Sequence, residues 1–255
     1  RRGLDSSDSF ILSVNYLTTL AAFVWKGRID DALHWYSKTK ELSHPYQDID
    51  LMAEILRGYV LFLNGEIREG QKILEEIRMK EKKLGCLAGG FSYLRIQSSI
   101  YLFTRYIGWF ERAREELSSV EAQDQDHVSL PGLVFLYRAW IALGEEQYRE
   151  AKELLECALP SLETGIANRL PYALNALGEA LLMLGDLECA ERVLRRCIDW
   201  NLENGNLDQL IWAWRLMTDV HLRQGSRDSA RHACSTAYRL SCSSKMKPHL
   251  AWSLA

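Results

Sequence analysis

Cysteine and histidine are the side chains best suited to nucleophilic attack and metal binding, and the chain contains six of each. The sequence has no Cys-x-x-Cys pair and no cluster of cysteine and histidine with zinc spacing. The sequence therefore predicts no metal site. Several cysteines lie in stretches with a helical pattern, where a small buried thiol packs well, and these indicate free thiols in a reducing compartment such as the cytoplasm. They are Cys157, Cys189, Cys197 and Cys234.

Other motifs for catalysis are also missing from the sequence. There is no Gly-x-x-x-x-Gly-Lys-Ser/Thr phosphate loop and no Gly-x-Ser-x-Gly elbow. His221 and His232 lie on opposite helices of one predicted hairpin and could meet, although a packing or surface role is favoured for them. Carboxylate pairs such as Glu115-Glu116 fall at helix starts or surfaces, where they suit the helix dipole better than acid–base catalysis. We therefore expect a protein that is not an enzyme and needs no cofactor.

Composition excludes several further classes of protein. Hydrophobic residues make up 47% of the chain and charged residues 25%, which is typical of a folded protein with a buried core. The formal net charge of −3 argues against direct binding of nucleic acid, because that task needs an excess of basic side chains. No apolar run approaches the ~18–20 residues that a membrane-spanning helix requires.

Regularly spaced glycines organise the chain into a repeat. Glycine followed five residues later by a small residue recurs, and a copy at Gly144 and Ala151 carries two extra residues. Successive glycines lie 38, 43, 36, 41 and 40 residues apart, a spacing typical of stacked helical arrays. The regular copies are Gly27 with Ala32, Gly65 with Gly70, Gly108 with Ala113, Gly185 with Ala190, and Gly225 with Ala230.

Each repeat has the pattern of two antiparallel helices joined at the glycine. In residues 169–202, Gly185 permits the left-handed conformation that ends the first helix, and Asp186 can cap the second. Small residues at Gly178 and Ala190 let the two helices approach closely. A single hairpin cannot bury its apolar face, so neighbouring hairpins must stack. The predicted pairs are 9–25 with 29–42, 48–64 with 66–84, 90–107 with 109–121, 130–143 with 147–162, 169–184 with 186–202, and 208–224 with 226–241, before a partial helix from Pro248.

The fifth repeat resembles a tetratricopeptide repeat. It carries Leu177-Gly178 in the first helix, Gly185 at the turn, Ala190 five residues later, and then Leu194 and Cys197. This resemblance implies an all-α fold: an α-solenoid, or right-handed superhelix, of about six helix hairpins. We expect residues 1–255 to form a single such domain, as a piece of a longer protein. Repeats of about forty residues are similar to the sensor arrays of MalT-type transcription activators, which lie between an ATPase module and a C-terminal helix-turn-helix.

The resemblance also implies which residues line the concave face, because the first helix of each pair faces inward in such arrays. Arginine and aromatic side chains there would suit an extended peptide, a carboxylate or a phosphate group. The alternative is a solvated face with internal pairs between arginine and acidic side chains. Trp212 and Trp214 lie two apart on one helix, so we expect only one of them on this face. The positions are Tyr59, Arg95, Ser98, Arg105, Arg138, Tyr172, Asn175, Glu179, Trp212, Arg215, Asp219 and Arg223.

Two functions remain open from the sequence. The first is an interaction domain that binds a protein, a peptide or a small effector, or packs on flanking domains, as the sensor of a signalling or transcription-regulating protein. The second is the regulatory or scaffold arm of a multidomain enzyme with its catalytic module elsewhere in the chain. An apolar array end could also pair with another copy of the protein.

Overall fold

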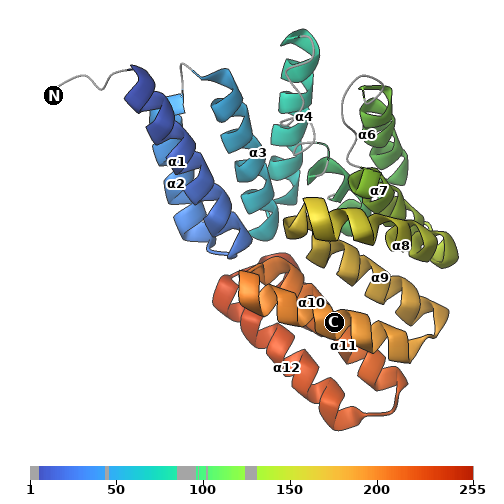
Figure 1. Cartoon of the computed structure of the whole chain (residues 1–255). Coiled ribbons are helices and arrows are strands. Elements are labelled where there is room, and N and C mark those ends of the chain that lie inside the picture. Colours follow the sequence, from blue (N-terminus) through green and yellow to red (C-terminus); the bar gives the residue numbers. More distant parts are fainter. Residues whose placement is uncertain are drawn as a thin grey trace. The chain divides into compact units, whose positions relative to one another are not determined.

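The computed structural model of the chain describes residues 6–43, 46–84, 96, 98–101, 103–123 and 131–254. Every regular element within these ranges is helical, and the helices follow one another as antiparallel neighbours, which confirms the predicted all-α fold of helix hairpins (Figure 1). The elements are α1 (Ser6–Trp25), α2 (Ile29–Ser43), α3 (Gln47–Leu63), α4 (Ile67–Leu84), the π-helical segment η1 (Phe103–Ile107), α6 (Phe110–Gln123), α7 (Pro131–Gly144), α8 (Tyr148–Gly165), the 3-10 turn η2 (Ala167–Arg169), α9 (Leu170–Leu184), α10 (Leu187–Asn204), α11 (Leu207–Arg223), α12 (Arg227–Ser244) and α13 (Lys247–Leu254).

The chain forms two compact units by its own contacts. The N-terminal unit comprises residues 1–98 and 242–252, and the C-terminal unit comprises residues 99–241 and 253–255. We expected residues 1–255 to form a single domain. The division into two compact units does not test this expectation, which stays a prediction.

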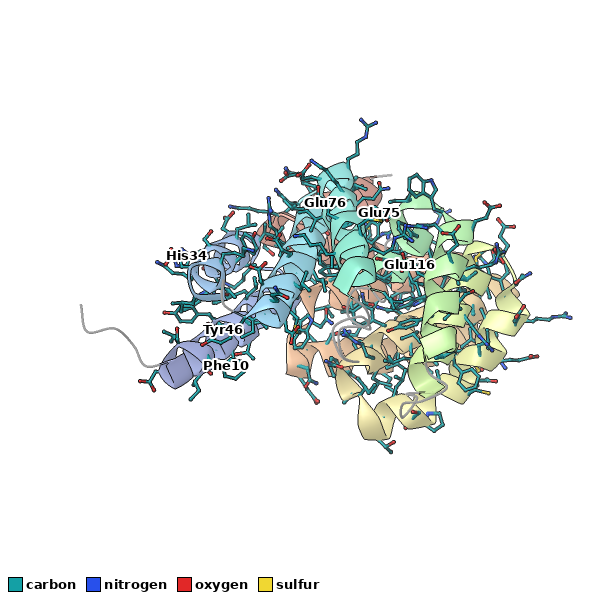
Figure 2. The ribbon with its side chains drawn as sticks, turned by 90° about the horizontal axis from the view of Figure 1, so that it is seen from above. Phe10, His34, Tyr46, Glu75, Glu76 and Glu116 are labelled. Atoms are coloured by element: carbon teal, nitrogen blue, oxygen red, sulfur yellow. The ribbon has the colours of Figure 1, made fainter. Side chains whose placement is uncertain are left out.

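In the N-terminal unit, helices α1 to α4 are joined by the returning segment at 242–252. Figure 2 shows Phe10 of α1 beside Tyr46, the residue that precedes α3; their rings meet edge to face with centroids 5.2 Å apart. The ammonium of Lys245 lies 2.6 Å from the Asp30 carboxylate in α2. This second contact connects α2 to a segment more than two hundred residues later.

The turn between the helices of each hairpin uses one backbone conformation. We expected the fourth turn at Gly144, but the left-handed residue is Glu146, with φ of 61°. Gly144 is required for another reason, because a Cβ at this position would lie 2.0 Å from the Phe110 ring. With Glu146 in place, the left-handed residue at each of these hairpin turns precedes the small residue of the next helix by five positions. The other hairpin turns have Gly27, Gly65, Gly108, Gly185 and Gly225, with φ between 64° and 83°; Gly205 and Lys245 are also left-handed but lie outside these turns.

The fifth hairpin shows why the sequence folds in this way. The Asp186 side chain accepts a hydrogen bond of 3.2 Å from the Cys189 amide and thereby caps α10, as predicted. A Cβ at Gly178 would lie 2.5 Å from the Leu194 side chain, and Ala190 is fully buried. These small residues therefore allow the close approach of α9 and α10 that the sequence predicted.

In the C-terminal unit, the first and the second helices of successive hairpins form two layers. The first helices of successive hairpins pack directly on one another, α7 on α9 and α9 on α11. The second helices α8 and α10 pack between them, each against the first helices on both sides. We call α7, α9 and α11, together with η1, the first-helix layer; it carries most of the predicted site residues.

Candidate functional site

A buried aromatic cluster forms the base of the first-helix layer. The Tyr101 ring lies 5.0 Å from the Trp140 ring and 5.4 Å from the Tyr172 ring, measured between centroids. Tyr101 and Tyr172 are each 4% exposed and Trp140 is 1% exposed. Tyr172, predicted to face a ligand, therefore packs among other rings and supports the layer.

A chain of buried hydrogen bonds connects α9 to the first turn of α11. The Asn175 side-chain amide donates to the backbone carbonyl of Gln209 (2.9 Å) and to the side-chain Oε1 of Gln209 (3.0 Å). The Gln209 amide donates in turn to the Tyr101 hydroxyl (2.8 Å) and to the Asp208 carboxylate (2.7 Å). Burial, followed by the charge of Asp208, raises the pKa of Tyr101 well above its ordinary value. Asn175 is 2% exposed and its amide is engaged within the fold, and its contact with a ligand stays a prediction.

Arg105 lies where three elements meet. Its guanidinium forms an ion pair with Glu179 of α9 and lies 4.3 Å from the Trp212 ring centroid in α11. The Arg105 side chain is 8% exposed and that of Glu179 is 23% exposed. Burial alone would lower the pKa of Arg105, but the charge of Glu179 and its hydrogen bond raise it. Arg105 therefore stays ionised, with its counter-ion on the more exposed side of the pair.

A second guanidinium lies near the same indole. Arg215 is 5.4 Å from the Trp212 ring centroid and half-buried. Burial lowers the pKa of Arg215, and the charge of Arg105 lowers it further, against the attraction of Asp219. Burial raises the pKa of Asp219 despite the neighbouring cations. We call Arg105, Glu179, Trp212, Arg215 and Asp219 the arginine–tryptophan cluster.

The remaining predicted site residues occupy varied positions. Arg223 is exposed at the end of α11 and donates a hydrogen bond of 2.8 Å to the Leu182 carbonyl, and Arg138 is exposed on α7. Tyr59 is half-buried on α3 in the N-terminal unit, and Ser98, also in that unit, is buried. Arg95 lies outside the described residues.

Reasoning from the sequence missed two residues of this layer, Asp208 and Gln209, and their partner Tyr101, which lies just before η1. Asp208 and Gln209 lie in the first turn of α11, and they meet Tyr101 across more than one hundred residues of chain. Polar residues after the Asn206 cap looked like an ordinary helix start, so no local signal distinguished them. Their role is revealed by the tertiary contacts of Asp208 and Gln209 with Tyr101.

Metal-binding groups and membrane-spanning helices were sought in the part of the chain that the structure describes. Within it, no group of three or more His, Cys, Asp or Glu side chains could hold a metal ion. Among the described helices, none is long and apolar enough to cross a membrane. The described cysteines are free thiols, and burial raises the pKa of Cys197 above its ordinary value.

Comparison with known proteins gives matches in structure alone. Neither family models nor the sequences of curated proteins match the chain. The structure of NprR in complex with its cognate peptide NprX is similar to the whole chain, with a TM-score of 0.69 and 15% identity over 73% of NprR. The structure of Rap protein complexed with competence and sporulation factor matches 94% of the chain and 80% of Rap, with a TM-score of 0.54 and 14% identity.

At such low identity these likenesses concern the fold. The similarity to MalT-type activators stays a prediction, because neither structure bears on it. The repeated turn, five residues before a small residue, and the stacked hairpins agree with the likeness to these solved structures. The chain is an α-solenoid of tetratricopeptide-type repeats.

Proposed function

We propose that this chain is an interaction domain that binds a peptide or an extended protein segment, as the sensor or regulatory part of a larger signalling or transcription-regulating protein. Two solved structures with the same fold, NprR and Rap, are complexes with a peptide and with competence and sporulation factor respectively. In this proposal the domain works by binding, without catalysis, in the cytoplasm. Flanking domains of the same chain are the nearest candidates to receive the signal.

The observation that carries the proposal is the arginine–tryptophan cluster. Two guanidinium groups, Arg105 and Arg215, flank one indole on the first-helix layer. A guanidinium presents a planar fork of donors that matches a carboxylate, and partial burial strengthens such a bond. The arrangement therefore suits an acidic side chain or C-terminal carboxylate of a peptide, with the indole contacting its apolar part.

The predicted residues divide into two roles under this proposal. Arg105, Glu179, Arg215 and the exposed Asp219 would contact the ligand. The buried Asn175 would instead hold α9 to α11, and the buried Tyr172 would hold α9 to Trp140 of α7. The exposed Arg138 and Arg223 extend the surface toward the two ends of the layer.

Selection and titration would test the proposal. Peptides selected on the immobilised chain from a random library would be titrated into the wild type and into Arg215→Ala. We expect a loss of affinity of about tenfold, equal to about 1.4 kcal/mol, because a half-buried donor fork is removed.

Arg231→Ala is the matched control, because Arg231 is an exposed arginine on α12, outside the first-helix layer. It should bind the selected peptide as the wild type does. Equal affinity of Arg215→Ala and the wild type for every selected peptide would contradict the proposed site. Failure to select any peptide would contradict the proposed function itself.

A further inference from the structure

A cavity lies between α10, α11 and α12, apart from the arginine–tryptophan cluster. Its volume is about 480 Å³, which lies in the range of small-molecule sites. All its lining residues belong to the C-terminal unit. We call it the α10–α12 pocket, and it is lined by Arg195, Ile198, Asp199, Trp214, Met217, His221, Asp228, Ser229 and His232.

The pocket has an apolar floor and an aromatic wall. Ile198 and Met217 are 5% and 3% exposed, so their side chains form packed surface beneath the cavity. The Trp214 and His232 rings meet edge to face, with centroids 6.0 Å apart and planes at 78°. The two histidines that the sequence left as packing or surface residues therefore line one cavity. Such a wall favours a flat, apolar ligand.

A hydrogen-bonded relay fixes the proton position on His221. Because the Glu191 carboxylate only accepts, the Gln224 amide nitrogen donates to it, at 2.8 Å. The Gln224 oxygen then faces His221 Nδ1, at 3.1 Å, and must accept its proton. In the neutral ring, Nε2 is consequently an acceptor. His221 is only 9% exposed and lines the cavity, so this acceptor is available to a ligand inside it.

The charges around the pocket favour a cation. Arg195, the basic residue among the lining side chains, already pairs with Glu191 at 2.5 Å. The two lining carboxylates, Asp199 and Asp228, form no ion pair among the described interactions of the chain. An ammonium group of a ligand would satisfy both, whereas a ligand carboxylate would be repelled.

We propose that the α10–α12 pocket binds a small aromatic amine, with a ring N–H donated to His221 Nε2 and an ammonium group beside Asp199 and Asp228. The aromatic ring packs against Trp214 over Ile198 and Met217. This ligand class combines the three features of the pocket: an apolar floor, a buried acceptor and two carboxylates. The site is separate from the proposed peptide surface, so either can be correct without the other.

Three indole compounds test the ligand chemistry by titration calorimetry on the whole chain. Tryptamine carries both the ring N–H and the cation, 1-methyltryptamine lacks the N–H, and indole-3-propionate replaces the cation by an anion. We expect tryptamine to bind, 1-methyltryptamine to bind at least fivefold more weakly, and indole-3-propionate at least tenfold more weakly. Equal affinities for the three compounds, or no heat with millimolar tryptamine, would overturn the proposal.

Substitutions in the protein test the same site independently of changes in the ligand. Asp228→Asn should weaken the binding of tryptamine at least threefold. The variant should still bind 1-methyltryptamine more weakly than tryptamine. Glu150→Gln is the control, because Glu150 is an exposed carboxylate of α8, a helix that does not line the pocket, and its neutralisation changes the net charge equally. An equal effect of the two variants would show general electrostatic attraction in place of a pocket and would contradict the assignment.

Discussion

The ion pair between Glu179 and Arg105 provides the sharpest test of the first-helix layer. In Glu179→Gln the acceptor oxygen remains but the negative charge is lost, while the guanidinium of Arg105 stays 8% exposed. Removing one partner of a buried pair leaves an uncompensated charge in a poorly solvated place. The variant therefore separates the charge of Glu179 from its hydrogen bond.

The magnitude follows from distance and burial. Two unit charges about 4 Å apart attract by about 4 kcal/mol at an effective dielectric constant of about 20. The Glu179 side chain is 23% exposed and glutamine keeps one hydrogen bond, so we expect about half of this, a loss of about 2 kcal/mol in the free energy of unfolding. For a chain of this size, that corresponds to a fall in Tm of about 4–8 °C.

A matched variant makes the reasoning refutable. Glu163→Gln breaks the pair with Arg196, whose side chains are 40% and 51% exposed, and exposed pairs contribute about 0–1 kcal/mol. Urea unfolding of both variants would measure the difference. If the two variants lost equal stability, the pair at Arg105 would be solvated, and its use in the proposed site would lose its basis.

The same variant has a second, functional readout. With Glu179 neutral, Arg105 is available to a ligand carboxylate, so we expect an acidic peptide to bind about fivefold tighter than to the wild type. A neutral peptide of the same length should bind both forms equally. Weaker binding of the acidic peptide would show that Glu179 holds a cationic group of the ligand.

Further predictions concern the fold. Glu146→Gly should raise the free energy of unfolding by about 0.5–1 kcal/mol, because glycine adopts the left-handed turn without strain; unchanged urea stability would contradict this. Gly144→Ala should lower it by about 1–3 kcal/mol, because the new Cβ meets the Phe110 ring, and an unchanged Tm would refute the close approach. Cys197 should react with a thiol reagent only on unfolding, since it is buried and its pKa is raised; rapid reaction in the native chain would oppose this. The exposed cysteines should react at once; they are Cys157, Cys234 and Cys242.

The sequence predicts most of the helix boundaries because glycine at a hairpin turn is a local signal. Gly185 and Gly225 adopt the left-handed conformation that their spacing indicated. Glu146 shows the limit of this signal, because a non-glycine residue can take the same conformation at a cost that the rest of the hairpin offsets. The turn was predicted at Gly144 for a related reason. The small size of Gly144 allows the contact with Phe110, which no local sequence pattern reveals.

The candidate site was predictable only in part. Counting along each first helix brings Arg105, Glu179 and Trp212 to one layer, and the structure places their side chains in contact. Counting does not tell which side chains remain accessible. Counting along the helix assigned Asn175 to the ligand, whereas in the structure its side chain bonds to Gln209, which lies 34 residues away on another hairpin. Burial of this kind depends on tertiary packing, which a helical period does not encode.

Helix α11 shows how one element can serve two surfaces. Successive residues of a helix turn by about 100°, so Trp212 and Trp214 point about 200° apart. The first indole meets the guanidinium of Arg105, and the second meets the ring of His232. The sequence established that the two rings could not share a face, but both faces offered apolar and basic neighbours. Only the ion pair of Arg105 with Glu179 on one side, and the relay from Glu191 through Gln224 to His221 on the other, give the two tryptophans different chemistry.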